Sequence, residues 1–259
     1  MATIKEIVKD FYNLENDIFF NQLHDTGEAF YTFNENIEYE IWNHAFPYDI
    51  KIKDNEELAF STFVRDTISF YLSKNRKPVI YLDDKYFAGK LHNILHENKF
   101  EMFDNEAWMQ FKKLNYDYIP NNISLEMKIV DTIEKFEDFS KVVNTCFSKT
   151  YSAELKKDFN KNFGFKKIEH YTFWENNTLI GVSSIYYDKK TAHIHNVGVL
   201  PLFRGHGFGK AIIKYLIEHI LNDLKIPVYL QAEGVSVESF YKKLGAETFY
   251  RRYGYILNY

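Results

Sequence analysis

The stretch LPLFRGHGFGKAII at residues 200–213 places an arginine and three glycines between a strand-like apolar run and an amphipathic, helix-like run. Glycine tolerates positive φ and close backbone approach, so successive N–H groups in such a loop can converge on one anion. The following helix adds its unsatisfied N–H groups and the positive end of its dipole. Arg204 and Lys210 add formal charge. The segment is therefore either a phosphate-binding loop or a glycine-rich turn without a ligand, and the surrounding sequence must decide.

Two common phosphate-binding motifs do not fit this loop. A P-loop reads G-x-x-x-x-G-K-[ST], but here Arg204 stands at the leading glycine and Ala211 at the Ser/Thr position. The dinucleotide motif G-x-G-x-x-G would need a third glycine where Lys210 stands. Neither nucleotide-binding fold is supported.

Composition favours a folded protein that binds a small molecule. Hydrophobic residues make up 46 % of the 259 positions, and no apolar run approaches the roughly 20 residues of a membrane helix. The N-terminus lacks the apolar core of a signal peptide, so we expect a cytoplasmic protein without membrane contact. A net charge of −4 argues against nucleic-acid binding. Cys146 is the single cysteine and is expected to be a buried structural thiol, and no Cys/His cluster has the spacing of a metal site.

Turn-forming residues at 120–124 separate two runs of predicted secondary structure, so we predict domains over 1–120 and 121–259. In the first, the pattern predicts a hairpin within 29–46, strands at 77–82, 99–104 and 107–119, and helices over 4–24, 56–73 and 87–98. In the second, it predicts strands at 125–130 and 228–233, three strands between 166 and 200, one or two in the tail, and helices over 133–148, 153–163, 207–221 and 237–245. The expected class is α/β with a mixed sheet.

The two halves share a faint repeat. Residues 77–104 and 226–252 each contain a strand led by proline, a short helix and a further strand. True duplication and convergence on a common βαβ pattern both explain this similarity. The first copy has no counterpart of RGHGFG, and Leu95 stands where the second has Tyr241. If there are two copies, only the second is equipped for chemistry.

Two motifs over residues 124–257 resemble those of the GCN5-related N-acetyltransferase (GNAT) family. Residues 204–209 match [QR]-x-x-G-x-[GA] and follow a strand that ends in V-x-P at Val199 and Pro201. Further along, FYKKLGA at 240–246 is similar to the family's L-Y-x-K-x-G-F helix. The resemblance implies the GNAT acyl-CoA N-acyltransferase fold, in tandem with a degenerate GNAT-like copy in the first half.

The resemblance also implies an acetyl-CoA site. The backbone of Val197 and Val199 would pair with the pantetheine arm, and the N–H near Val197 or Gly198 would bind the thioester carbonyl. Gly234 replaces the family's pantetheine-binding asparagine, a role open to Ser236 or Ser239. The pyrophosphate would be wrapped by Arg204, Gly205, His206, Gly207, Phe208, Gly209 and Lys210. Tyr241 occupies the position of the acid that protonates the leaving thiolate.

Three alternatives are open for the base that deprotonates the amine, namely His193, His195 and Glu233, and a water chain is a fourth. The expected function is acetyl transfer from acetyl-CoA to a primary amine of a small molecule or protein, within a ternary complex. A non-catalytic acyl-CoA sensor and a tRNA-dependent aminoacyl transferase are the alternatives. The sequence leaves the acceptor and the oligomeric state open.

Overall fold

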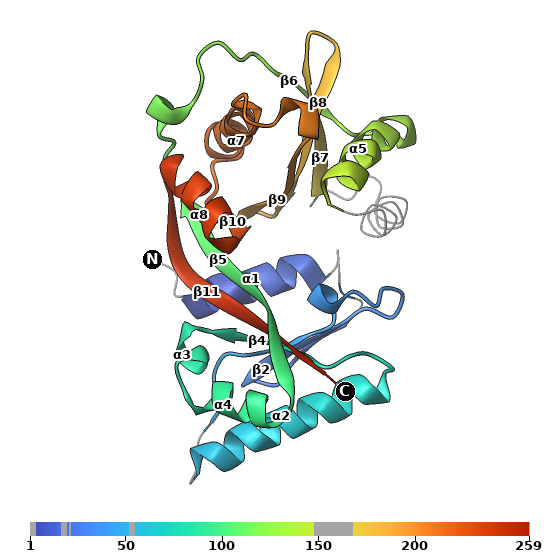
Figure 1. Ribbon diagram of the computed structural model, residues 1–259, viewed down its shortest axis with the longest axis vertical. Coiled ribbons are helices and arrows are strands. Elements are labelled where there is room, and N and C mark those ends of the chain that lie inside the picture. The colour runs from blue at the N-terminus through green and yellow to red at the C-terminus, as the bar shows by residue number, and fades with distance from the viewer. Residues whose placement is uncertain (1–3, 17–19, 21, 52–54, 148–167, 259) are drawn as a thin grey trace. The chain divides into compact units, whose positions relative to one another are not determined.

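The computed structural model describes residues 4–16, 20, 22–51, 55–147 and 168–258 (Figure 1). The chain forms two compact units, unit 1 with residues 1–108 and 249–259 and unit 2 with residues 109–248. The division falls within two long strands, β5 (Phe100–Phe111) and β11 (Ala246–Leu257), each of which begins in one unit and ends in the other. The sequence predicted a single domain boundary at residue 120. Turn-forming residues can be recognised in a sequence, whereas a strand that is shared by two units leaves no local signal.

Unit 1 is a mixed sheet with helices on both faces. Its strands follow the order β1-β2-β3-β4-β11-β5, with antiparallel β1/β2, β2/β3 and β4/β11 pairs and a parallel β3/β4 pair. The elements besides β5 and β11 are α1 (Ile4–Asn16), β1 (Gln22–Asp25), β2 (Ala29–Phe33), a 3-10 turn (Glu40–Trp42), β3 (Ala45–Pro47), α2 (Glu56–Ser73), β4 (Val79–Asp83), α3 (Asp84–Phe87) and α4 (Lys90–Glu97).

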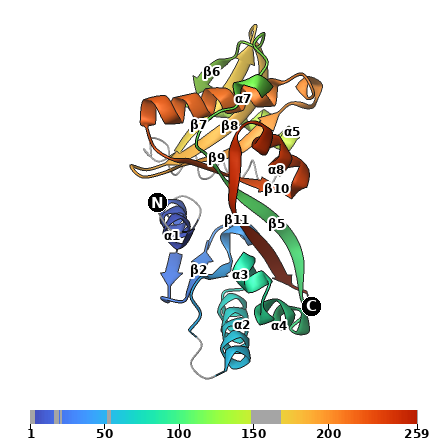
Figure 2. The ribbon, with the colours of Figure 1, turned by 90° about the vertical axis from the view of Figure 1, so that its left-hand side faces the viewer.

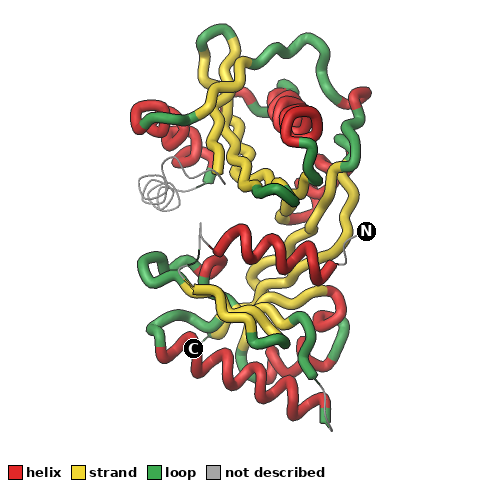
Figure 3. Tube along the Cα trace, turned by 180° about the vertical axis from the view of Figure 1, so that it is seen from behind, coloured by secondary structure: helices red, strands yellow, loops and turns green. Residues whose placement is uncertain are grey.

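Alternation along the strands explains how both faces of this sheet are covered. Ala29 and Tyr31 share a core with α2 and α4, whereas Phe30 between them stacks on Tyr12 of α1, with ring centroids 5.0 Å apart. Figures 2 and 3 show α1 and α2 on opposite sides of these strands. Successive strand residues point to opposite faces, so an unbroken apolar run such as AFYTF suits a strand that is buried on both.

A buried ion pair links β11 to β5 on the α1 face of unit 1, and tyrosines of α1 and β4 contact its guanidinium. Arg252 of β11 is 3 % exposed, and its Nη2 and Nε lie 2.8 and 3.0 Å from Oε2 of Glu106 on β5. Its Nη1 donates to the Tyr12 hydroxyl at 3.2 Å, and the guanidinium lies 4.0 Å from the centre of the Tyr81 ring. The Tyr12 hydroxyl lies 2.6 Å from Nε2 of His44. The cation is thus surrounded by partners that offset its loss of water.

Unit 2 repeats the connectivity of unit 1. Strands β7 (Ile168–Glu175), β8 (Thr178–Tyr187) and β9 (Ala192–Val199) are antiparallel neighbours, helix α7 (Phe208–Glu218) follows, and β10 (Val228–Glu233) lies parallel to β9. The remaining elements are β6 (Glu126–Ile129), α5 (Ile133–Cys146), a 3-10 turn (Pro201–Phe203), a π-helix (His219–Leu224) and α8 (Gly234–Lys243). The mixed α/β class is confirmed, and the predicted repeat corresponds to β4-α3-α4-β5 and β10-α8-β11.

Several predicted elements differ from the structure. The helix predicted over 4–24 ends at Asn16, and β1 follows it. Residues 99–119 form the single strand β5 and a loop with a short 3-10 turn instead of two strands. The periodicity of a short apolar run does not by itself separate strand from helix, and it does not fix where a long strand ends. The helix predicted over 153–163 lies outside the described residues.

Candidate functional site

The candidate site lies where β9 and β10 separate. Their parallel pairing runs from Ala192 and Val228 to Ile194 and Leu230, although β9 continues to Val199 and β10 to Glu233. The two strands therefore diverge toward their carboxyl ends. In α/β sheets, ligands bind outside the carboxyl ends of the strands, at points where neighbouring strands part.

A β-bulge in β9 faces this opening. Asn196 has φ of +57°, and the β8/β9 register shifts so that Ser184 pairs with His195 but Val182 pairs with Gly198. One residue of β8 thus opposes two of β9, which bends the strand and changes the direction of its last residues. Asn196 Nδ2 donates to Ser184 Oγ at 3.3 Å, and Ser184 Oγ lies 2.7 Å from His170 Nδ1. The sequence did not indicate these hydrogen bonds, because His170, Ser184 and Asn196 lie on three different strands.

A cavity of about 350 Å³ opens beside the bulge. It is lined by Cys146 at the end of α5 and Phe147 after it, by Val197, Gly198 and Val199 of β9, by Arg204 and Gly209, and by Ser236, Val237, Phe240 and Tyr241 of α8. An added Cβ at Gly198 would lie 3.2 Å from both Cys146 Cβ and the Phe147 ring, so a larger residue there would have to displace these side chains.

Cys146 differs from the expected buried structural thiol. It is half-buried, it lines this cavity, and its Sγ donates to the Val199 carbonyl at 3.3 Å. Partial burial raises the pKa of the thiol, although Arg204 opposes this effect. The side chain is therefore a neutral wall of the cavity, which the sequence did not indicate, because α5 is distant from β9 along the chain.

The glycine-rich loop forms a second cavity of about 540 Å³. Its lining comprises Pro120, Val199, Phe203, all seven residues from Arg204 to Lys210, and Phe240. Gly207, with φ of +91°, precedes α7 at the N-cap position without a side-chain cap. An added Cβ there would lie 2.6 Å from Pro120 Cγ, so both backbone conformation and space require glycine. Val199, Arg204, Gly209 and Phe240 line both cavities, which therefore adjoin.

The cavity of about 350 Å³ beside the bulge is the inner cavity, and the one of about 540 Å³ at the glycine-rich loop is the outer cavity. Tyr241, to which the family motif pointed, is an ionisable residue of the inner cavity. It is 7 % exposed, and the Phe240 and Phe111 rings flank it. Burial raises the pKa of its hydroxyl well above the ordinary value near 10, so the phenol stays neutral. Within the described part of the chain, no side chain or backbone group hydrogen-bonds this hydroxyl. It is therefore available to a group in the cavity.

Not every predicted site residue is brought to these cavities. Ser236 lines the inner cavity, whereas Ser239 is exposed and lines neither of them. His193 is 1 % exposed and stacks on the Tyr229 ring at 5.3 Å, and burial lowers its pKa well below the usual value. His195 packs against Tyr186, and Glu233 is exposed before α8. None of these three candidate bases belongs to the lining of either cavity.

The buried imidazole of His170 makes stability depend on pH. Complete burial lowers its pKa to about 4, against about 6.5 in an unfolded chain. Its contribution to stability is therefore complete above pH 6.5 and is lost as the pH falls toward 4. We expect this histidine alone to lower the free energy of unfolding by up to about 3 kcal/mol across that interval.

Urea unfolding of the wild type and of His170→Asn between pH 4 and 7 measures this effect. The variant keeps a polar atom near the position of Nδ1, and its slope should be shallower. Because other buried histidines titrate in both proteins, the difference between the two curves isolates His170. The exposed His24→Asn is the control, and equal slopes for all three proteins would contradict the assignment.

Among the residues that the structure describes, no set of three or more His, Cys, Asp or Glu side chains is placed to hold a metal ion. No helix in the same residues has the length and apolar character needed to cross a membrane.

Comparison with known proteins places this site in a family. The sequence profile of the acetyltransferase (GNAT) family matches residues 136–246, which include the bulge, the glycine loop and Tyr241. Residues 136–246 form a GNAT domain. No curated protein sequence matches the chain.

Solved structures extend the likeness to the whole chain. A conserved protein of unknown function from Staphylococcus epidermidis is 16 % identical, with a TM-score of 0.74 and coverage of 96 % of both chains. A GCN5-related N-acetyltransferase from Kribbella flavida has a TM-score of 0.74 at 11 % identity and covers 100 % of this chain and 97 % of its own. A tandem GNAT protein from the clavulanic acid biosynthesis pathway has a TM-score of 0.57 at 11 % identity, covering 82 % of this chain and 74 % of its own. These likenesses confirm the predicted fold, and together with the GNAT domain they support acyltransferase activity.

Proposed function

We propose that this protein is an acetyl-CoA-dependent N-acetyltransferase that moves an acetyl group directly to a primary amine of a small molecule or protein within a ternary complex. The observation that carries the proposal is the pair of adjoining cavities beside the separated strands β9 and β10. One contains the glycine loop at the start of α7, and the other contains Tyr241.

The outer cavity has the properties of a diphosphate site. Gly205 and Gly207 both have positive φ, which turns the loop backbone back on itself before α7. The N-terminus of α7 has no side-chain cap, so its first N–H groups are available to an anion. Arg204 adds charge while its Nε donates to the Val199 carbonyl at 2.9 Å, which fixes the side chain against β9. We assign the pyrophosphate of coenzyme A to this loop and the pantetheine arm to the backbone edge of Val197 and Val199.

The inner cavity supplies groups for acyl transfer. In this reaction the amine nitrogen forms a C–N bond to the thioester carbon, and the C–S bond breaks with its electron pair leaving on sulfur. A backbone N–H of Val197 or Gly198 would bind the carbonyl oxygen as negative charge develops. Because burial raises the Tyr241 pKa further above that of a thiol, near 8.5, we assign its hydroxyl as a hydrogen-bond donor to the departing sulfur. Since His193, His195 and Glu233 do not line the cavities, we assign removal of the amine proton to water.

Arg204→Gln is expected to weaken CoA binding about tenfold or more, because a charge-assisted hydrogen bond contributes roughly 1.5–3 kcal/mol. Isothermal titration calorimetry with CoA measures this directly. Lys214→Gln is the matched control, since Lys214 lies on α7 outside the lining of both cavities. Gly207→Asp should abolish binding, but it also strains the loop, so Arg204→Gln is the decisive variant. An unchanged Kd in Arg204→Gln and in Gly207→Asp would contradict the diphosphate assignment.

A further inference from the structure

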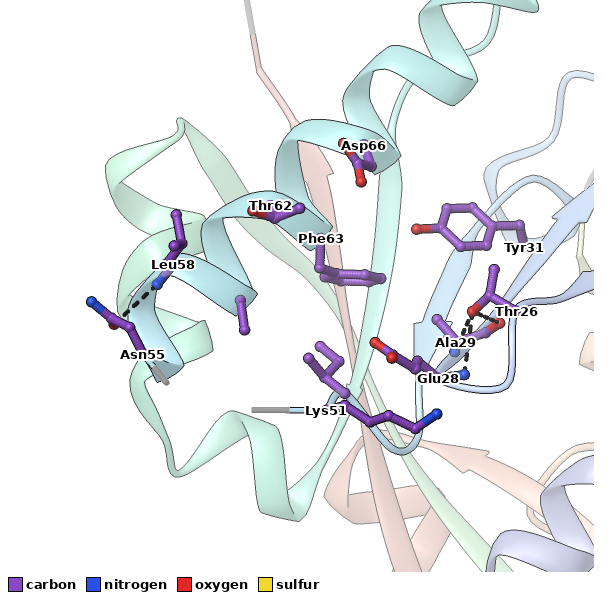
Figure 4. Close-up of a pocket in the computed structure, with 12 residues that line it drawn as sticks. Thr26, Glu28, Ala29, Tyr31, Lys51, Asn55, Leu58, Thr62, Phe63 and Asp66 are labelled. Atoms are coloured by element: carbon purple, nitrogen blue, oxygen red, sulfur yellow. Dashed lines mark hydrogen bonds between the residues drawn. The ribbon is translucent and has the colours of Figure 1, made fainter. Parts of the chain in front are cut away.

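We infer that unit 1 carries a second small-molecule site, for an organic cation with an apolar body, in the cavity between α2 and the β1–β2 hairpin (Figure 4). This cavity measures about 560 Å³, within the range of roughly 300–1,000 Å³ typical of ligand pockets. It is separate from the site proposed for CoA, because all its lining residues belong to unit 1.

The floor of the cavity suits an apolar or aromatic group. Ala29 and Tyr31 come from β2, Ile50 from the loop before α2, and Phe63 from α2, and each is at most 9 % exposed. In Figure 4 the Phe63 ring lies between the helix and the hairpin, with the Tyr31 hydroxyl directed toward it. Two aromatic rings in such a floor can also attract a cation through their π faces.

Carboxylates stand on both walls. Half-buried Glu28 lies on the hairpin side, where its side chain makes no ion pair with any described residue, and Figure 4 shows its carboxylate directed into the cavity. Asp66 lies on α2, and its ion pair with Arg65 at 3.7 Å is solvent-exposed and therefore weak. Burial raises the pKa of the Tyr31 hydroxyl most, and the carboxylates of Asp66 and Glu28 raise it further. Their effect on Tyr31 indicates negative potential at the cavity floor.

The first turn of α2, beside this cavity, is unsuited to an anion. The Asn55 side chain accepts from the N–H groups of Glu57 and Leu58, so the first turn of α2 is already capped, unlike that of α7. Glu56 and Glu57 add negative charge to that turn. Lys51 is the cation of the lining, but Figure 4 shows its ammonium directed away from the Phe63 ring. Charge and capping together favour an ammonium group over a phosphate or carboxylate.

Calorimetry of the full-length protein with three probes of similar shape tests the inference. We expect 2-phenylethylammonium to bind, the neutral 2-phenylethanol to bind more weakly, and phenylacetate not to bind. Glu28→Gln and Asp66→Asn should each weaken binding of the ammonium probe by about two- to fivefold, and by about tenfold together. Glu57→Gln, on the same helix but outside the cavity lining, should change it by less than about twofold.

Three outcomes would overturn the inference: no binding of the ammonium probe at millimolar concentration, equal binding of phenylacetate, or an affinity unaffected by the Glu28 and Asp66 changes. The Glu28 and Asp66 variants should leave CoA affinity unchanged, whereas Arg204→Gln should leave binding of the ammonium probe unchanged. Failure of this site and failure of the proposed function are therefore distinguishable.

Discussion

Replacing Tyr241 with phenylalanine is expected to lower kcat for acetyl transfer by about 10²–10³-fold while leaving the affinity for CoA within about twofold. The change removes one hydroxyl from a buried, neutral side chain that has no hydrogen-bond partner within the described residues. The fold should therefore tolerate it. Loss of one preorganised donor to charge that develops in the transition state costs roughly 3–4 kcal/mol. Release of the CoA thiol across a panel of primary amines and lysine peptides measures the rate.

Tyr215→Phe is the matched control for this experiment. Tyr215 lies on α7, and its hydroxyl accepts from the Leu125 N–H at 3.3 Å outside both cavities. This control should change stability slightly and transfer hardly at all. If Tyr241→Phe retains the wild-type rate, the role assigned to its hydroxyl is wrong. If the wild type binds CoA but acetylates no member of the panel, the protein acts as an acyl-CoA sensor instead.

Glu106→Leu is expected to lower the free energy of unfolding by about 3–5 kcal/mol, because it leaves the Arg252 guanidinium buried without its carboxylate. Arg252 is 3 % exposed, so water cannot replace the lost partner without disrupting the core. Guanidinium chloride unfolding of the full-length protein measures the change.

Two companion variants separate the ion pair from general packing effects. Glu247→Gln breaks an exposed ion pair in which Glu247 Oε2 lies 2.6 Å from Lys112 Nζ. This change should lower the free energy of unfolding by at most about 1 kcal/mol. Adding Arg252→Met to Glu106→Leu should recover much of the lost stability, since the guanidinium is then removed together with its carboxylate partner. A cost for Glu106→Leu no greater than that for Glu247→Gln would contradict this account.

Local sequence determined the elements whose information lies within a few residues. Asn55 before an apolar helical pattern marks the start of α2, because the cap and the helix it begins are adjacent in the chain. The apolar–charged alternation in LEMKIV at 125–130 likewise predicts β6. In the structure, Asn176 and Asn177 both have positive φ and form the tight turn of the β7–β8 hairpin. The loop from Arg204 to Gly209 was recognisable because its arginine and glycines have the spacing of the GNAT family motif.

Only the tertiary structure decided how distant segments meet. Arg252 and Glu106 are separated by 146 positions, and nothing near either residue indicates the other. The bulge at Asn196 depends on Ser184 and His170 of two other strands, and the inner cavity needs Cys146 from the end of α5. Periodicity records which face of an element is buried, but strand register and partner choice arise from long-range packing. For that reason the sequence by itself pointed to the glycine loop and Tyr241 as candidate site residues. The two cavities that they line, and the cavity in unit 1, became visible only in the assembled sheets.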